Sequence, residues 1–292
     1  MLRSKEAFSR RSFLQASAAA AGGLLTTRSL AAAEVTGDLG AGISLGVQSY
    51  TFRNFDLEPA LKRIQDLGLK HAEFYSKHIP PESSPEKLKG ILKLCKEYDV
   101  TPVGFGVSRF TKDHAANKKL FEFGKAIGIR YLSASPTPDA FDSLDKLCDE
   151  YRIAIAIHPH GPSGKGRDPW WSAEIIMKAV KDHNKLIGAC LDTGHLIRMA
   201  QLGEKLDPAQ QVRVMGDRNF GMHLKDHDNK RKEDVVFGDP NGVLDVAAVL
   251  KALREVKFKG AICIEYEAHP ADPSPDMKKC VAFTRDSAKK LG

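Results

Sequence analysis

Short apolar segments alternate with amphipathic segments from residue 44 to the end of the chain. Eight apolar segments have the length and composition of buried β-strands. They are Ser44–Tyr50, His71–Tyr75, Pro102–Val107, Tyr131–Ala134, Ile153–His158, Leu186–Asp192, Gly221–Leu224 and Ala261–Tyr266. Between them apolar residues recur near i, i+3, i+4 and i+7, which predicts helices in segments such as Pro59–Leu67, Pro85–Tyr98, Ala115–Ile127 and Leu244–Val256. Gly68, Gly128 and Gly260 follow helical segments, where a left-handed C-cap is common.

This alternation predicts one α/β domain over residues 34–292. Eight strand–helix units in roughly 250 residues are typical of the (β/α)₈ TIM barrel. No long Pro/Ser-rich linker divides the chain. The alternative is an open doubly wound sheet, which normally carries a glycine-rich phosphate turn after its first strand. The segment Gln48-Ser49-Tyr50-Thr51 is not such a turn.

The first 33 residues have the composition of a signal peptide. Arg10 and Arg11 precede a mildly apolar stretch, Ala16–Leu25, and the small residues Ala31–Ala33 follow. We interpret residues 1–33 as a twin-arginine signal peptide, with the twin-arginine export machinery as partner and a periplasmic or otherwise exported location. The alternative is an amphipathic helix packed on the domain, but helical apolar periodicity is lacking. The apolar stretch is also too short for a stable membrane span.

Charge and cysteine usage narrow the class of protein. The whole chain carries a net charge of +7, of which the signal segment holds +4 through five basic residues and one acidic residue. The remaining +3 is modest, and no Lys/Arg block is interleaved with aromatic residues, so we expect no nucleic-acid partner. The five cysteines have no CxxC spacing, which argues against a disulfide framework and favours core positions.

Polar side chains collect where the last four predicted strands end. These side chains are His158, His160, Asp192, His195, His223, Lys225, Glu265 and Glu267. The carboxyl ends of barrel strands meet at one face, and residues two apart on a strand point the same way. Two imidazoles and two carboxylates from four neighbouring strands predict one divalent metal ion. A histidine at a strand end is often structural, and an Asp–His pair without metal would explain two of the four residues.

The chain resembles the xylose-isomerase-like TIM-barrel superfamily, in its sugar phosphate isomerase/epimerase branch. The matching motifs are Asp192-Thr-Gly-His195, His223-Leu-Lys-Asp226, and Gly242-Val-Leu-Asp245 followed by Ile264-Glu-Tyr-Glu267. The resemblance implies metal ligands at Asp192, His223 and Glu265. The mixed nitrogen and oxygen ligands favour Mn²⁺ as the first choice of ion, with Co²⁺, Zn²⁺, Fe²⁺ or Mg²⁺ as alternatives.

The fifth strand departs from the family pattern. Many members carry a glutamate where this chain has His158, within His158-Pro159-His160. The two histidines are about 6 to 7 Å apart along an extended strand, so one ion is not reached equally well by both. We expect His158, which ends the apolar segment, to be the fourth ligand. His160, nearer the mouth, is then expected to touch substrate or move a proton.

Other polar residues receive roles from the same resemblance or from their positions. His195 is expected to contact substrate or act as acid or base, and Lys225 to steady an enolate or an anionic group, with a rim salt bridge as the alternative. Glu73 faces substrate or caps the barrel, and Asp226 orients a neighbouring ligand. Trp170, next to Trp171 and the charged pair Arg167 and Asp168, either stacks on a sugar ring or anchors the following helix.

The implied activity is a metal-dependent sugar isomerase or epimerase acting on a keto-sugar or polyol through an enediolate, with Glu265 as base. The alternatives are a lyase or hydratase on a keto-sugar or keto-glycoside, and a non-catalytic sugar-binding barrel. An apurinic-site endonuclease needs a three-metal cluster, and this chain supplies too few histidines and acids at the strand ends. A homo-oligomer remains compatible with the sequence.

Overall fold

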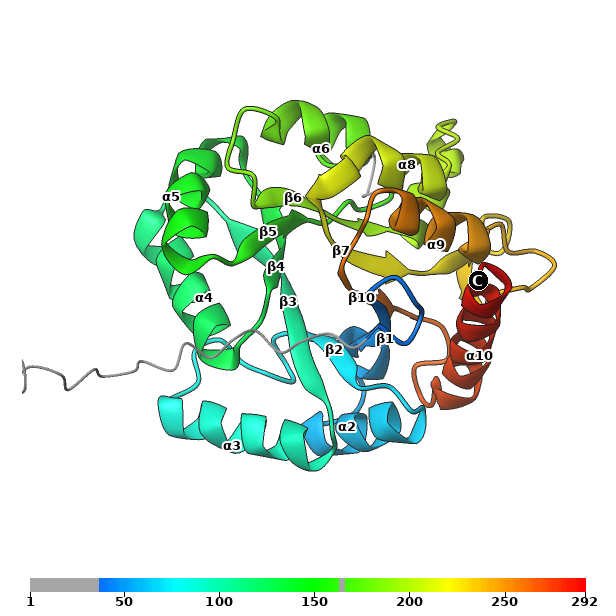
Figure 1. Cartoon of the computed structure of the whole chain (residues 1–292), viewed down its shortest axis with the longest axis horizontal. Coiled ribbons are helices and arrows are strands. Elements are labelled where there is room, and N and C mark those ends of the chain that lie inside the picture. The colour runs from blue at the N-terminus through cyan, green and yellow to red at the C-terminus, as the bar shows by residue number, and fades with distance from the viewer. Residues whose placement is uncertain (1–36, 163–165) are drawn as a thin grey trace, which may run out of the picture. The chain divides into compact units, whose positions relative to one another are not determined.

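The computed structural model describes residues 37–162 and 166–292 (Figure 1). The predicted signal peptide lies outside these residues. Eight parallel strands close into a barrel in the order β1-β10-β7-β6-β5-β4-β3-β2. They are β1 (Ile43–Gln48), β2 (His71–Phe74), β3 (Thr101–Phe110), β4 (Tyr131–Pro136), β5 (Ala154–Ile157), β6 (Ile187–Asp192), β7 (Asn219–Leu224) and β10 (Gly260–Ile264). Each overlaps one predicted strand, so the predicted TIM barrel is confirmed.

Helices surround the barrel and cover the outer face of its sheet (Figure 1). They are α2 (Leu57–Asp66), α3 (Pro85–Glu97), α4 (His114–Ile127), α5 (Phe141–Tyr151), α6 (Ala173–Val180), α7 (Thr193–Arg198), α8 (Pro208–Met215), α9 (Val246–Glu255) and α10 (Ser274–Lys290). Their apolar residues are buried against the strands, as the 3.6-residue periodicity requires. Helix and sheet together therefore enclose the main core.

Two of the three predicted C-cap glycines are confirmed. Gly68 and Gly128 have φ values of 66° and 74°, in the left-handed region that glycine adopts without steric cost. The prediction for Gly260 is wrong, because that residue is the first of β10. After α9 the left-handed conformation is taken instead by Lys257, at a φ of 59°.

A small antiparallel hairpin of β8 (Asp226–Asp228) and β9 (Glu233–Val235) was not predicted, since three-residue strands carry little periodicity. The Asp226 carboxylate accepts hydrogen bonds from the backbone N–H groups of Val243 and Leu244, each at 3.0 Å. Gly242 is needed beside it, because a Cβ there would collide with that carboxylate. Asp226 therefore anchors the loop before α9, and the predicted role in orienting a metal ligand is not what its contacts show.

Tyr131 fills the middle of the barrel interior. Gly104 and Gly221 face its ring, and a Cβ at either position would overlap it. The phenol oxygen donates a hydrogen bond of 2.7 Å to the Glu73 carboxylate. Two glycines thus leave room for one large side chain, which in turn supports the polar groups at the strand ends.

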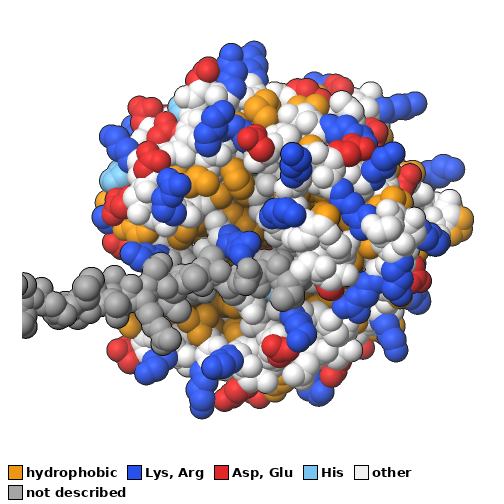
Figure 2. Space-filling model, in the orientation of Figure 1, with side chains coloured by type: hydrophobic (Ala, Val, Ile, Leu, Met, Phe, Trp, Pro, Cys, Tyr) orange, Lys and Arg blue, Asp and Glu red, His pale blue; other side chains and the backbone are white. Residues whose placement is uncertain are grey.

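The remaining general features agree with the composition. All five cysteines are buried and free. Among the described residues no helix is both long and apolar enough to cross a membrane. On the face shown in Figure 2, Lys and Arg side chains are interspersed with Asp and Glu.

Candidate active site

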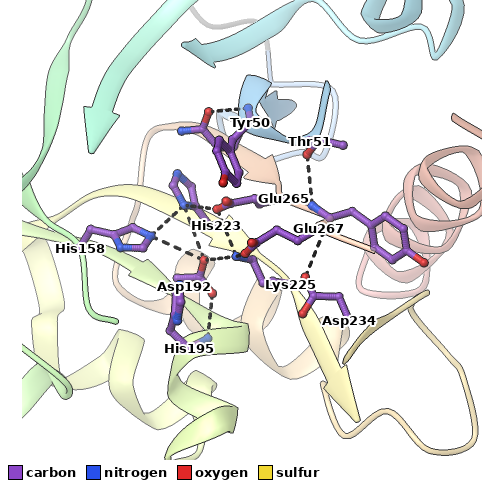
Figure 3. A network of polar contacts seen from close by, with 12 residues as sticks. Tyr50, Thr51, His158, Asp192, His195, His223, Lys225, Asp234, Glu265 and Glu267 are labelled. Atoms are coloured by element: carbon purple, nitrogen blue, oxygen red, sulfur yellow. Dashed lines mark hydrogen bonds and ion pairs between the residues drawn. The ribbon is translucent and has the colours of Figure 1, made fainter. Parts of the chain in front are cut away.

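The four predicted metal ligands meet at the carboxyl ends of β5, β6, β7 and β10. One donor atom from each of His158, Asp192, His223 and Glu265 lies within 4.8 Å of the other three (Figure 3). His223 Nδ1 is 3.1 Å from both His158 Nε2 and Glu265 Oε2, and Asp192 Oδ2 is 3.5 Å from His158 Nε2. Parallel register brings them together, since Asp192 pairs with His223 across β6 and β7.

The chemistry of this donor set fits a divalent ion. Asp192 Oδ1 accepts the backbone N–H of His195, whereas Oδ2 is buried and receives no hydrogen bond from the described residues. Burial raises the pKa of Asp192, but Lys225 and the neighbouring imidazoles of His195, His158 and His223 together outweigh it and keep the pKa well below the usual value. An ionised buried oxygen facing two imidazoles is the environment that a borderline cation such as Mn²⁺, Co²⁺, Zn²⁺ or Fe²⁺ satisfies.

Lys225 lies among the carboxylates and not at a rim. Its side chain is fully buried, with Nζ 2.6 Å from Glu267 Oε1, 3.3 Å from Asp192 Oδ2 and 3.4 Å from Glu265 Oε2. Burial lowers the pKa of this amine, and the three carboxylates more than offset that effect and raise it. Lys225 is not among the residues that line the cavity, so the rim salt bridge is wrong and its expected contact with substrate stays a prediction.

Glu73 lies inside the barrel and does not line the cavity. Its carboxylate accepts hydrogen bonds from Gln48 Nε2 at 2.8 Å, the Tyr131 hydroxyl and His223 Nε2 at 2.9 Å. Burial raises the pKa of Glu73, but the adjacent His223 and these hydrogen bonds lower it overall. Because an ionised carboxylate only accepts, His223 donates through Nε2 and turns Nδ1 toward Asp192 and Glu265. Glu73 thus orients His223, one of the predicted metal ligands, in place of the predicted contact with substrate.

His160 and His195 line the cavity, as their predicted contact with substrate requires. The His160 side chain is 38% exposed against 3% for His158, so it lies nearer the mouth as predicted. Burial lowers the pKa of His160 to about 4 and that of His195 well below its usual value. Gly161 donates its backbone N–H to His195 Nδ1 at 2.9 Å. Both rings are therefore neutral at pH 7, and because His195 Nδ1 accepts the Gly161 N–H, the hydrogen of that ring is on Nε2, which can donate a hydrogen bond.

Trp170 is placed away from the cavity. Its indole is buried, donates Nε1–H to the carbonyl of Pro136 at 3.0 Å and packs edge-on against Phe141. The predicted stacking on a sugar ring does not fit this position. Trp170 instead anchors the segment before α6, because its apolar bulk is better accommodated in the core. Arg167 lies over the neighbouring ring of Trp171, 5.4 Å from its centroid.

The cavity above the four ligands has a volume of about 510 Å³. The residues that line it include several that were not assigned from the sequence, among them Gln48, Tyr50, Tyr75, Val107 and Arg198. Glu267 also lines the cavity, as expected from the strand parity that it shares with Glu265. Tyr50 and Val107 belong to predicted strands, and nothing in the linear sequence distinguishes them from core residues.

A closed barrel with a mixed imidazole–carboxylate cluster at its strand ends defines a TIM barrel with a candidate metal site. The family model described as "Xylose isomerase-like TIM barrel" matches residues 61–287, and the chain belongs to that family. No curated protein matches the sequence.

Three solved structures illustrate the relationship. An uncharacterised protein from Parabacteroides distasonis is 26% identical, with a TM-score of 0.65 over 84% of this chain and 99% of that one. D-psicose 3-epimerase is 16% identical, with a TM-score of 0.61 over 85% and 97% of the two chains. L-ribulose 3-epimerase is 14% identical, with a TM-score of 0.65 over 85% and 96%. The two epimerases share the fold of this chain, at identities that carry no residue roles across.

Proposed function

We propose that the protein is a divalent-metal-dependent sugar isomerase or epimerase acting on a keto-sugar or polyol. The observation that carries the proposal is the cluster of four donor atoms within 4.8 Å, from four neighbouring strand ends. His158, His223 and Glu265 of this cluster also line the cavity, where substrate would bind. That similarly folded proteins are named D-psicose 3-epimerase and L-ribulose 3-epimerase supports the same class of reaction.

His158, Asp192, His223 and Glu265 would hold the ion, with Mn²⁺ as the first choice. When bound, the ion supplies Lewis-acid stabilisation of negative charge that develops on a carbonyl oxygen. Two further residues complete the cluster. Lys225 balances the charge of the carboxylates, and Glu73 fixes the orientation of His223.

Glu265 is the proposed base. Burial raises its pKa, but Lys225 and His223 lower it overall, so the carboxylate is ionised at neutral pH and able to accept a proton. The proton leaves the carbon next to the carbonyl and its electron pair forms an enediolate. Return of a proton to the opposite face of that carbon gives an epimer. Return to the former carbonyl carbon, with transfer of the hydroxyl proton to the other oxygen, gives an isomer. His160, on the β5 side of the cavity, is the proposed partner for that second transfer.

The test combines metal content with deuterium exchange. Asp192→Ala and Glu265→Ala should each lose bound Mn²⁺ and the uptake of solvent deuterium into free and 3-keto sugars. His160→Ala should keep the metal and lose turnover. Exposed Asp182→Ala and Glu58→Ala are the controls and should behave as wild type. Near-stoichiometric metal in both ligand variants would refute the assignment.

Elimination or hydration on a keto-glycoside is the second candidate. The cavity mouth favours it, because Tyr50 and Val107 are 37% and 42% exposed there and extend an apolar wall beyond the polar cluster. Such a wall suits the aglycone of a glycoside. Elimination releases the aglycone from a 3-keto-glucoside, whereas epimerisation retains it, so product analysis on one substrate separates the two reactions.

The proposed place of action is outside the cytoplasm. The paired arginines and the small-residue segment support twin-arginine export, and this region lies outside the described residues. Free sugars and glycosides are the substrates expected in that compartment.

A further inference from the structure

We propose that Arg109 binds a carboxylate group of the substrate, so that the protein prefers acidic sugars to neutral ones. The inference rests on the proposed function, because it concerns the same cavity. Arg109 is exposed and lines that cavity. Within the described parts of the chain its guanidinium has no hydrogen bond or ion pair. A cavity wall therefore presents a positive charge that a ligand is free to use.

The backbone of Arg109 is held in place. With ten residues, β3 is the longest strand of the barrel, and its last three residues still pair with β4, Arg109 with Ser135. The next residue, Phe110, is fully buried, and its carbonyl accepts the backbone N–H of Thr137 at 2.9 Å. Because the arginine stands on a strand and not on a loop, binding needs to order only its side chain.

The position of β3 places Arg109 across the mouth of the barrel from the proposed metal ligands. In the closed strand order β3 is four places from β7 and three places from both β6 and β10. These three strands lead to Asp192, His223 and Glu265. A keto-sugar whose carbonyl oxygen is at the metal site would direct the other end of its carbon chain toward β3. The cavity of about 510 Å³ is of the size that small-molecule sites have.

The other charged side chains of the cavity are already paired. Arg198 donates a hydrogen bond of 2.8 Å to Asp234. The carboxylates of Glu265 and Glu267 are 3.4 and 2.6 Å from Lys225 Nζ. Among the described residues that line the cavity, Arg109 is thus the cation whose charge no carboxylate balances. A ligand that brings one negative charge would balance it.

A carboxylate matches this position better than a phosphate does. A guanidinium donates two parallel N–H groups to a carboxylate, and the two single charges cancel. A phosphate ester carries nearly two negative charges and is usually held by the N-terminal N–H groups of a helix or by several cations. Arg109 on β3 offers neither. Val107, two residues earlier on the same side of the strand, is 42% exposed, and such an apolar neighbour strengthens an ion pair by excluding water.

The experiment compares the binding of three keto-sugars that differ only at C6. D-Fructuronate has a carboxylate there, D-fructose has a hydroxymethyl group and D-fructose 6-phosphate has a phosphate ester. In calorimetric titrations with Mn²⁺ present, D-fructuronate should bind to the wild type at least about 10-fold more tightly than D-fructose, as a charge-assisted hydrogen bond implies. Arg109→Gln should remove this preference, and Arg109→Lys should keep part of it, because the charge remains without the planar fork.

Arg152→Gln is the matched control. Its side chain is 76% exposed and lies outside the cavity, so the variant should keep the wild-type preference. Circular dichroism checks that each variant is folded.

Three outcomes would overturn the inference. The wild type fails to bind D-fructuronate more tightly than D-fructose, or the preference persists in Arg109→Gln. In the third, D-fructose 6-phosphate binds more tightly than D-fructuronate through Arg109, which would assign the position to a phosphate. All of these are binding measurements without turnover. Binding of D-fructuronate that depends on Arg109, in a protein that takes up no solvent deuterium into any sugar, would refute the isomerase and retain the carboxylate site.

Discussion

At the scale of single residues, the site depends on a carboxylate that never reaches the cavity. Glu73 is fully buried and receives hydrogen bonds from Tyr131, Gln48 and His223. A buried carboxylate is costly unless its oxygens are satisfied, and here three donors do so. The same contacts fix which nitrogen of His223 faces the other ligands. Glu73 thus connects barrel packing to the orientation of His223, a proposed metal ligand.

Glu73→Gln should therefore weaken Mn²⁺ binding by about 10- to 100-fold while the barrel stays folded. The amide is isosteric but cannot accept as a carboxylate does, so His223 loses its fixed orientation. Titration calorimetry measures the affinity, and circular dichroism checks the fold. Exposed Glu82→Gln is the control. Equal affinities for Glu73→Gln and wild type would show that Glu73 does not position the ligand.

A second prediction at this scale concerns pH and His78. The ring is buried against Tyr75, and burial lowers its pKa to about 4. In the unfolded chain the pKa is about 6.5, so the unfolded state binds a proton first as the pH falls. His78 therefore stabilises the fold above pH 6.5 relative to acid, and this contribution, up to about 3 kcal/mol, is lost between pH 6.5 and 4.

His78→Gln should flatten that part of the stability profile. Urea unfolding at pH 7 and pH 4.5 gives the free energy of unfolding for both proteins, and the difference between the two pH values should be smaller in the variant. A pH difference as large in the variant as in wild type would show that other groups carry the acid sensitivity.

At the scale of elements, the motif that ends in Asp226 and the motif that begins at Gly242 contact each other. The Asp226 carboxylate, just after β7, accepts the N–H groups of Val243 and Leu244 before α9. Gly242 has no side chain because that carboxylate occupies the space. The contact ties the end of β7 to the start of α9, and so holds the strand that carries His223 and Lys225.

Gly242→Ala should destabilise the protein by roughly 1–3 kcal/mol, because the added methyl group must displace a hydrogen-bonded carboxylate. Gly90→Ala is the matched control, and its expected change in the free energy of unfolding has the opposite sign. Gly90 is exposed within α3 and a Cβ there meets nothing within 4 Å, so alanine should stabilise by roughly 0.5–1 kcal/mol. Thermal unfolding of the two variants measures both effects. A Gly242→Ala protein as stable as wild type would contradict the steric argument.

At the scale of the whole molecule, the barrel converts residues far apart in the sequence into one site. His158, Asp192, His223 and Glu265 come from neighbouring strands of the closed sheet, and parallel pairing puts all of their ends at the same face. The apolar core between the helices and the strands holds the barrel together. The polar residues at the carboxyl ends of the strands are therefore available for binding or chemistry.

The whole chain also carries the proposed export signal, ahead of the barrel. Arg10→Lys together with Arg11→Lys should keep the protein in the cytoplasm, because the twin-arginine machinery reads the arginine pair. Barrel folding should be unaffected, since residues 61–287 match the family by themselves. Cell fractionation with immunodetection measures the distribution. Normal export of the double variant would rule out this pathway.

The sequence by itself determined the class of fold and most of the candidate ligands. Period-two and 3.6-residue patterns are local, and parity along each strand is enough to place His158, Asp192, His223 and Glu265 at one face of a barrel. The hairpin of β8 and β9 escaped prediction because three residues carry too little pattern.

Tertiary structure alone decided what each remaining polar residue touches. Glu73 lies beneath His223, Trp170 turns into the core, and Lys225 contacts three carboxylates from the ends of two strands, β6 and β10. The approach of the His160 ring to His158 and His195, with ring centres 4.7 and 5.0 Å apart, has no local signal either. These contacts depend on barrel closure and on the space that distant glycines leave, which no pattern along the chain records.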